Sequence, residues 1–356
     1  MPASSPPFDL VPFYCPVPPV LHPRTAQIEA AAFDWLERTG LAAGPEARQR
    51  MRDANGAEFY ARITPDADLE RIRPAVNWIY WGFGFDDVWC DAGPVSRDPG
   101  LFVARALYVL RMLQPLPPSP LAGDDPYPSA LAEVAADFRR LASPTQYQRW
   151  VQALRSWLLG AAGQVALAAS RTLPDLDSYL ALRLASCGGE PTSAMIEIVT
   201  GLEVPARELD SPLVVAATES ARMVAALDND LVSGWKEASL GQTGLNALTV
   251  IAAQDGCTAA TAAVRVSALR DRLMVLFLRL RERAETGASP ELRSYLAGLA
   301  NMVRGNLEWS ARVPRYHRLP GQELAPAFPG WSERPSDSAA GPPPLPSLAW
   351  WWGQLA

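Results

Sequence analysis

Three aspartates lie close together near residue 90, directly after a run of aromatic side chains. Asp86, Asp87 and Asp91 follow segment 78–85, which contains two tryptophans, a tyrosine and two phenylalanines. Neighbouring carboxylates repel one another unless a cation neutralises them, and Mg²⁺ prefers oxygen ligands while it keeps water and phosphate oxygens in its shell. Aromatic faces attract organic cations. Ionisation of a diphosphate to leave a carbocation is one of the few reactions that need both kinds of group in one pocket.

The spacing of these aspartates leaves a structural alternative open. On an α-helix, Asp87 and Asp91 are four residues apart and share a face, whereas Asp86 lies about 100° away. A solvated acidic helix end would have the same sequence, so this motif alone does not establish a metal site.

A second polar set lies on one predicted helix. Asn229, Ser233 and Glu237 fall at i, i+4 and i+8 and therefore point from the same helical face. They offer an amide oxygen, a hydroxyl and a carboxylate, which suit a hard cation. Lys236 adds a point charge suited to phosphate. The alternative, a polar outer face of an amphipathic helix, is less convincing because apolar residues surround the set.

Two further segments could contribute to an anion site. Arg315 and Tyr316 could hold a diphosphate through a guanidinium fork and a hydroxyl, although a basic helix C-terminus is also favoured by the helix dipole. Arg183 precedes Gly188 and Gly189, which predict a helix break. Such a break exposes backbone carbonyls to a nearby cation.

Composition excludes several classes of function. The chain has 356 residues and a formal net charge of −6 without a long Lys/Arg run, so a nucleic-acid partner is not expected. The Pro-rich start lacks the features of a secretory signal, and the longest nearly apolar segment, 157–169, is too short to span a bilayer. Only two histidines, His22 and His317, are present, which argues against a zinc site or a histidine triad. Four cysteines far apart favour reduced thiols in a cytoplasmic protein.

Helical patterns occupy most of the chain and must position these groups. In 25–39, for example, Ile28, Trp35 and Leu36 share one face, and Gly40 is a plausible stop. Runs of alternating β-branched residues are nearly absent, so the sequence predicts an all-α protein. The other predicted helices cover 45–62, 68–92, 99–113, 127–140, 144–171, 174–188, 191–201, 211–238, 242–254, 258–286 and 289–312.

Pro and Gly mark the boundaries of the predicted organisation. Residues 1–24 form a Pro-rich lead, residues 25–318 are expected to be one helical domain, and 319–356 form a Pro-rich C-terminal extension. The part up to residue 346 predicts a mobile segment. The extension ends in Trp350–Trp352, and three adjacent tryptophans rarely stay exposed without a partner surface. Docking over the site, docking on a second subunit and plain packing on the helices are the alternatives.

The order and spacing of these motifs resemble those of bacterial class I terpene synthases over nearly the whole chain. The aspartate-rich motif of that family, DDxxxD/E, matches Asp86, Asp87 and Asp91. Its second motif, NDxxSxxxE, is matched without departure by Asn229, Asp230, Ser233 and Glu237, with Lys236 as the usual basic residue before the glutamate. By this resemblance Asp86, Asp87, Asp91, Asn229, Ser233 and Glu237 are the metal ligands.

The same resemblance assigns the diphosphate-binding residues. The sensor arginine of the family lies about 46 residues before the asparagine, and 229 − 183 = 46 selects Arg183. Ser186 is then the linker and Cys187 the effector whose carbonyl faces the substrate. Two departures are Leu184 in place of a second arginine and Cys187 in place of the frequent glycine. The C-terminal RY pair of the family matches Arg315 and Tyr316, which would hold the diphosphate together with Arg183 and Lys236.

The resemblance implies a single-domain α-helical bundle around a deep apolar cavity. It also implies Mg²⁺, usually three ions, with Mn²⁺ as an alternative, and a homodimer is a further possibility. The expected reaction is ionisation and cyclisation of farnesyl diphosphate to a sesquiterpene hydrocarbon or alcohol, as in selinadiene-synthase-type cyclases. Released diphosphate would accept the final proton. Aromatic rings would stabilise the migrating charge by roughly 0.5–2 kcal/mol each; the candidates are Phe59, Trp78, Trp81, Phe83 and Trp309.

Three competing interpretations differ in testable ways. A diterpene cyclase acting on geranylgeranyl diphosphate would share the same head-group machinery and differ in cavity volume. A prenyl-chain-elongating synthase would normally carry a second aspartate-rich motif where this chain has Asn229 to Glu237. A non-catalytic helical binding protein would release no diphosphate from farnesyl diphosphate, and the simultaneous match of three motifs disfavours it.

Overall fold

The computed structural model describes residues 8–91, 93–114, 125–239, 244–319, 322–323 and 328–356. Nearly all regular structure in these residues is helical, which confirms the all-α prediction. The chain divides into two compact units, each made of separate segments. Unit 1 comprises Met1–Pro19, Leu173–Leu184 and Val204–Ala356, and unit 2 comprises Val20–Thr172 and Ala185–Glu203. A single helical domain over 25–318 stays a prediction.

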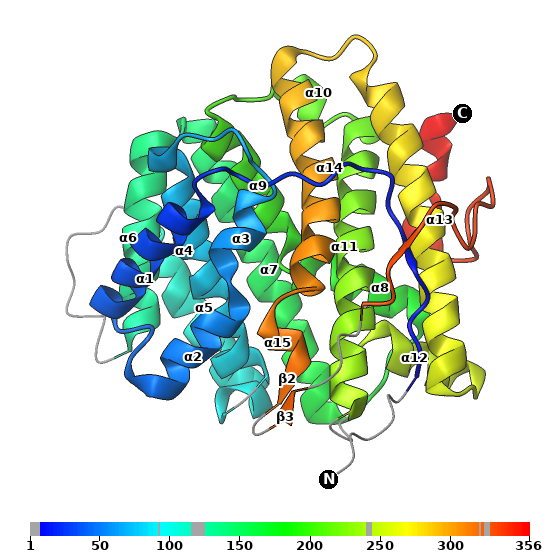
Figure 1. Cartoon of the computed structure of the whole chain (residues 1–356), viewed down its shortest axis with the longest axis horizontal. Helices are drawn as coiled ribbons and strands as arrows, with labels where there is room; N and C mark the ends of the chain where they lie inside the picture. The colour runs from blue at the N-terminus through cyan, green and yellow to red at the C-terminus, as the bar shows by residue number, and fades with distance from the viewer. Residues whose placement is uncertain (1–7, 92, 115–124, 240–243, 320–321, 324–327) are drawn as a thin grey trace. The chain divides into compact units, whose positions relative to one another are not determined.

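Unit 2 is built around helix α4, which packs against α1, α3 and α6, while α7 packs against α9 and α5 (Figure 1). Its interior is aromatic, with Trp81, Phe85 and Trp150 wholly buried. The elements of unit 2 are α1 (Thr25–Thr39), α2 (Gly44–Ala54), α3 (Gly56–Ala61), α4 (Leu69–Phe85), η1 (Asp86–Asp91), η2 (Val95–Arg97), α5 (Pro99–Arg111), α6 (Pro126–Leu141), α7 (Pro144–Ser170) and α9 (Gly189–Thr200).

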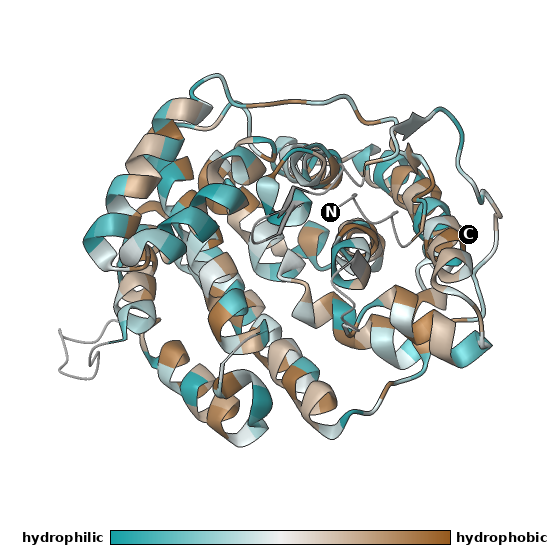
Figure 2. Ribbon diagram, turned by 60° about the horizontal axis from the view of Figure 1, so that its bottom comes forward, coloured by the Kyte–Doolittle hydropathy of each residue, from teal (hydrophilic) through white to brown (hydrophobic). Residues whose placement is uncertain are grey.

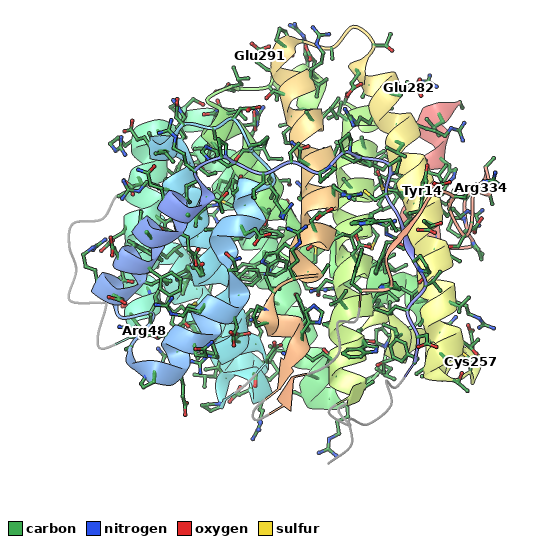
Figure 3. The ribbon with its side chains drawn as sticks, viewed as in Figure 1. Tyr14, Arg48, Cys257, Glu282, Glu291 and Arg334 are labelled. Carbon is green, nitrogen blue, oxygen red and sulfur yellow. The ribbon has the colours of Figure 1, made fainter. Side chains whose placement is uncertain are left out.

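Unit 1 is built around the long helix α11, which lies beside α13 and α14 (Figure 1). Helix α8 (Leu176–Ser186) belongs to unit 1 up to Leu184. Strand β1 pairs with β4 in parallel, and Tyr14 of β1 lies against α13 (Figure 3). The other elements are α10 (Ala206–Leu209), α11 (Pro212–Ser239), α12 (Ala247–Asp255), α13 (Ala259–Glu285), α14 (Pro290–Ser310), α15 (Pro314–His317), α16 (Pro346–Ala349), η4 (Trp352–Leu355), β1 (Phe13–Tyr14), β2 (Arg318–Leu319), β3 (Gln322–Glu323) and β4 (Trp331–Ser332).

Local chemistry explains where these helices begin and end. Hydrophilic and hydrophobic residues alternate along most of them, as amphipathic helices require (Figure 2). Ser143 starts α7 with a capping box completed by Gln146, and Gly40 ends α1 in the left-handed conformation with φ 81°.

Two predicted helices differ from the structure. The helix predicted over 45–62 is divided at Asn55, which adopts a left-handed conformation with φ 43° and caps α3 by accepting a hydrogen bond from the Glu58 N–H. Asparagine tolerates this conformation better than most residues. The helix predicted over 68–92 is α-helical only to Phe85 and continues as a π-helix, η1, through the three aspartates.

The described part of the C-terminal extension bonds to helices of unit 1, and the mobility predicted for 319–346 stays a prediction. The Ser336 N–H and hydroxyl both donate to Asp271 of α13, at 2.8 and 2.7 Å. Trp351 is wholly buried and Trp352 nearly so, whereas Trp350 is 40 % exposed. Residues 320–321 and 324–327 lie outside the described residues.

No single helix in the described ranges is long and apolar enough to cross a membrane. The pair α12 and α13 meets the length and composition criteria only together, and it is bent by 116° at its break.

Candidate active site and metal-binding residues

The aspartate motif lies on the π-helix η1 in unit 2. Asp86 and Asp87 are half-buried, and Asp91 is exposed. A π-helix forms i→i+5 hydrogen bonds and therefore has a wider turn than an α-helix. The three aspartates therefore lie on a helix with a wider turn than the α-helix that their spacing predicts.

Burial and the negative charge of this motif raise the pKa of two neighbouring side chains. Burial, the charge of Asp86 and a hydrogen bond to Asp86 raise the pKa of the Cys90 thiol far above its usual range, and Asp91 and Asp87 add to the effect. Burial and then the charge of Asp87 likewise raise the pKa of Tyr127. A divalent cation would relieve this repulsion.

The candidate aromatic residues of unit 2 fall into two groups. Phe59 and Phe83 are half-buried and meet edge to face, with ring centroids 6.2 Å apart and planes inclined at 68°. Trp81, in contrast, is wholly buried, donates its Nε1–H to the Tyr127 carbonyl at 2.8 Å and stacks on Phe85 at 4.9 Å. Trp81 is therefore packed as core, and Phe59 and Phe83 are the accessible rings.

Two more candidate rings are almost completely buried. Trp78 in unit 2 is 3 % exposed and meets Trp157 edge to face at 5.9 Å. Trp309 in unit 1 is 2 % exposed and meets Tyr316 edge to face at 5.6 Å.

The second motif lies on the regular helix α11 in unit 1. Asn229, Ser233 and Glu237 are half-buried, while Asp228, Asp230, Leu231, Val232, Gly234 and Trp235 beside them are buried. Regular helix geometry thus gives the three predicted ligands one partly accessible face, as their spacing indicates. The Asn246 amide donates to Glu237 Oε2 at 2.8 Å. Burial nevertheless raises the pKa of Glu237 above its ordinary value.

Arg183 on α8 is bonded directly to this motif. Its Nε donates to Asp230 Oδ1 at 2.9 Å and its Nη2 to Asn229 Oδ1 at 2.7 Å. Asp230 is almost fully buried and also accepts hydrogen bonds from the Tyr179 hydroxyl at 2.6 Å and the Ala247 N–H at 3.0 Å. Asp230 therefore holds Arg183, the predicted sensor, a role that its fixed place in the NDxxSxxxE motif could have suggested.

Helix α15 completes the network in unit 1. The Asn229 amide donates to the Tyr316 hydroxyl at 2.8 Å, and Lys236 Nζ donates to the Arg315 carbonyl at 2.6 Å. The four residues predicted to bind diphosphate, Arg183, Lys236, Arg315 and Tyr316, thus come from α8, α11 and α15 and meet at helix α11. Their diphosphate contacts stay a prediction.

The helix break predicted after Arg183 is present. Helix α8 ends at Ser186, Gly188 has φ 73°, and α9 begins at Gly189. Trp157 donates its Nε1–H to the Ser186 carbonyl at 3.1 Å. A Cβ at Gly160 would lie 2.6 Å from the Ser186 nitrogen, so only glycine permits this close approach of α7. Sequence reasoning missed both Trp157 and Gly160, because their role depends on tertiary contact.

The residue types of the two motifs fit Mg²⁺. Among the described residues, no group of three or more His, Cys, Asp or Glu side chains gathers closely enough to hold a metal ion unaided. Mg²⁺ does not require such a group, because it usually keeps several waters and binds through one or two carboxylates plus substrate phosphates. Asn229 and Ser233 supply neutral oxygens beside the carboxylate of Glu237, as such a site requires.

Comparison with known proteins identifies the family. The model described as terpene synthase family 2, C-terminal metal binding, matches residues 77–275, a range that includes both motifs. The chain belongs to the terpene synthase family. It is therefore a class I terpene cyclase that requires a metal and acts on an isoprenyl diphosphate, and the non-catalytic interpretation is set aside.

Full-length relatives agree with this assignment. The spiroviolene synthase of Streptomyces violens is 42 % identical over 350 residues, which cover 97 % of this chain and 96 % of the relative. The phomopsene synthase of Allokutzneria albata is 33 % identical, with 96 % of each chain covered. The crystal structure of SVS_A2, an ancestral sequence reconstruction, superposes with a TM-score of 0.87 at 43 % identity and covers 97 % of this chain and 99 % of its own.

Proposed function

We propose that Mg²⁺ is the metal of this terpene cyclase and that both motifs bind it. The ligands are Asp86, Asp87, Asp91, Asn229, Ser233 and Glu237, and three ions bind with the substrate. The observation that carries the proposal is the α8–α11–α15 network, in which Arg183 and Tyr316 bond to Asn229 and Lys236 bonds to the Arg315 carbonyl. The side chains of Arg183, Tyr316 and Lys236, which suit phosphate, thereby lie beside the helical face of α11 that carries the proposed ligands.

These residues have distinct tasks in the reaction. Bound Mg²⁺ supplies Lewis-acid stabilisation of the leaving diphosphate. Arg183 and Arg315 offer guanidinium donors to the phosphate oxygens, Tyr316 offers a hydroxyl, and Lys236 contributes a point charge. Such preorganised donors stabilise charge that develops as the carbon–oxygen bond breaks.

The hydrocarbon chain is handled by other residues. The half-buried rings of Phe59 and Phe83 stabilise the carbocation, at roughly 0.5–2 kcal/mol per well-placed ring, and Trp309 assists. The Ser186–Cys187 break presents backbone carbonyls to the positive charge. Released diphosphate accepts the final proton, so the reaction needs no side-chain base.

Farnesyl diphosphate is the proposed substrate, with geranylgeranyl diphosphate as the second candidate. Support for the first comes from a T-muurolol synthase of Streptomyces clavuligerus, 31 % identical, whose name describes it as farnesyl diphosphate cyclizing. Support for the second comes from a relative of 28 % identity that is named a diterpene cyclase. The selinadiene-synthase subgroup, the homodimer and the cytoplasmic location stay predictions.

Parallel incubation of the purified protein with geranyl, farnesyl and geranylgeranyl diphosphate and Mg²⁺ tests the substrate. Products are identified by gas chromatography with mass detection, and kcat/KM is measured for each substrate. We expect the largest kcat/KM with farnesyl diphosphate and no product after chelation of the metal. A larger value with geranylgeranyl diphosphate would replace the first candidate by the second, and turnover in the presence of chelator would contradict the metal requirement.

A further inference from the structure

The C-terminal segment 331–356, here called the C-terminal strap, runs across unit 1. It begins at β4, where Trp331 pairs with Phe13. It then follows α13, where Asp271 accepts two hydrogen bonds from Ser336 and Arg272 Nε donates to the Gly341 carbonyl at 3.0 Å. Nothing in the reaction described above uses this segment or its tryptophans.

The end of the strap reaches two helices of the network. The Ser347 N–H and hydroxyl both donate to Asp177 Oδ1, at 3.0 and 2.6 Å, and Asp177 lies in the first turn of α8. Trp351 is wholly buried and donates its Nε1–H to Glu219 Oε2 of α11 at 2.8 Å. The strap therefore ties the N-terminal end of α8 to α11.

Helix α8 is thus bonded to the rest of unit 1 at two places, its first turn at Asp177 and the part farther along that contains Arg183. Its first turn is held by Ser347, and farther along Tyr179 and Arg183 bond to Asp230 of α11. Arg183 lies six residues after Asp177 (183 − 177 = 6), or about 9 Å along a helix. Because a helix of this length is stiff, the position of its first turn determines where the Arg183 side chain lies along and around the helix axis.

We propose that the C-terminal strap positions the sensor arginine, with Ser347 and Trp351 as positioning residues for Arg183. The inference rests on the proposed role of Arg183 in binding diphosphate. It also gives the tryptophan cluster a function: Trp351 anchors the strap on α11, so that Ser347 can hold the first turn of α8. Small displacements of a binding group have large effects on a reaction that depends on orientation.

The test uses the full-length protein and inorganic diphosphate with Mg²⁺, followed by calorimetric titration and a thermal melt. Ser347→Ala removes one hydroxyl donor and is expected to weaken diphosphate binding roughly three- to tenfold. Ser347→Thr keeps the hydroxyl and should bind diphosphate about as well as the wild-type protein. Ser332→Ala is the matched control, because the Ser332 hydroxyl bonds within the strap to the Arg334 carbonyl and should leave binding unchanged. Asp177→Asn keeps an acceptor oxygen and provides a second, milder variant with a smaller loss.

A double-mutant cycle shows whether the effect passes through Arg183. Arg183→Lys loses the guanidinium fork and should weaken diphosphate binding by itself. Adding Ser347→Ala to this variant should then cause little further loss. An equal loss in both backgrounds, or a lowered Tm with unchanged diphosphate affinity in Ser347→Ala and Asp177→Asn, would overturn the positioning role. If Arg183→Lys itself binds diphosphate normally, the proposed function of Arg183 fails and the strap inference fails with it.

Discussion

The two motifs that are proposed to bind metal lie on helices of different geometry. The aspartate motif in unit 2 lies on a π-helix, and its carboxylates are partly or fully exposed and crowded together. The motif in unit 1 lies on the regular helix α11, and its Asn229 and Glu237 are engaged by neighbouring side chains. The predicted ligands Asn229 and Glu237 of the second motif are thus held by hydrogen bonds with Arg183, Tyr316 and Asn246.

This contrast implies different consequences for mutation. A change at the aspartate motif should affect stability less than a change on α11, because Asp86 and Asp87 are half-buried and Asp91 is exposed. A change on α11 disturbs a buried network that also holds Arg183 and the start of α12. Activity and stability measurements can therefore separate the two motifs.

The largest expected effect is the loss of activity when a ligand is removed from either motif. Asp86→Ala and Glu237→Ala should each lower kcat/KM by about 10³-fold or more, since the Mg²⁺-bound leaving group loses its stabilisation. Turnover is measured with farnesyl diphosphate at saturating Mg²⁺, and circular dichroism checks that each variant is folded.

Exposed acidic residues of the same units are the controls for this loss. Asp66 in unit 2 is exposed, as is Glu282 on α13 in unit 1 (Figure 3). Asp66→Ala and Glu282→Ala should keep near-normal turnover. Near-normal activity of Asp86→Ala would show that the π-helix does not bind the metal and would leave α11 as the only supported motif.

The second prediction concerns stability and should separate the two motifs most clearly. Asp230→Ala leaves Arg183, which is only 13 % exposed, without its carboxylate partner, and should lower the free energy of unfolding by about 3 kcal/mol. Asp87→Ala should lower it by less, because Asp87 is half-buried whereas Asp230 is almost fully buried. Urea denaturation measures both. Equal losses of unfolding free energy in Asp87→Ala and Asp230→Ala would mean that the aspartate motif contributes as much to stability as the motif on α11.

How far the sequence predicts these motifs depends on whether their geometry is local. The helix predicted over 211–238 is found at Pro212–Ser239, and because it is regular, the shared face of Asn229, Ser233 and Glu237 follows from spacing alone. The break after Ser186 was likewise signalled by Gly188, the residue that tolerates a positive φ.

Other features depend on contacts between distant segments, which spacing does not reveal. The π-helix begins at Asp86 in a segment whose sequence predicts a continuous α-helix. The role of Asp230 requires Tyr179 and Arg183 from another helix. The contacts of the strap are likewise not local: Ser336, Ser347 and Trp351 each meet a carboxylate on a distant helix of unit 1.

The third prediction uses Cys90 to report the negative charge of the aspartate motif. Because the pKa of Cys90 is raised, its thiolate is scarce and alkylation by iodoacetamide at pH 8 should be at least roughly tenfold slower than that of Cys257. Cys257 lies at the turn between α12 and α13 and is half-buried (Figure 3). Site-resolved mass spectrometry gives both rates.

Burial alone would also slow the alkylation of Cys90, so a charge variant is needed. Asp86→Asn removes one negative charge and keeps the shape of the side chain, and it should speed alkylation of Cys90 severalfold while that of Cys257 is unchanged. The same rate in wild type and variant would assign the slow reaction to burial and would remove the evidence for crowded charge.

The smallest expected effect is the pH dependence of Mg²⁺ binding by α11. Burial raises the pKa of Glu237, and a protonated carboxyl cannot bind the metal. As the pH falls, protons should therefore compete with Mg²⁺ at Glu237 sooner than at an ordinary glutamate, and the Mg²⁺ concentration for half-maximal activity should rise. In the metal-free protein the pH dependence of stability has the opposite sign. The folded state favours the protonated form of Glu237, so the contribution of Glu237 to stability falls as the pH rises from its unfolded pKa through its raised folded pKa.

Measuring activity at graded Mg²⁺ concentrations between pH 5 and 8 tests the competition between protons and Mg²⁺ at Glu237. Asn246→Ala removes the hydrogen bond that lowers the Glu237 pKa and should move the rise to higher pH, whereas an unshifted profile would place the proton competition on another ligand.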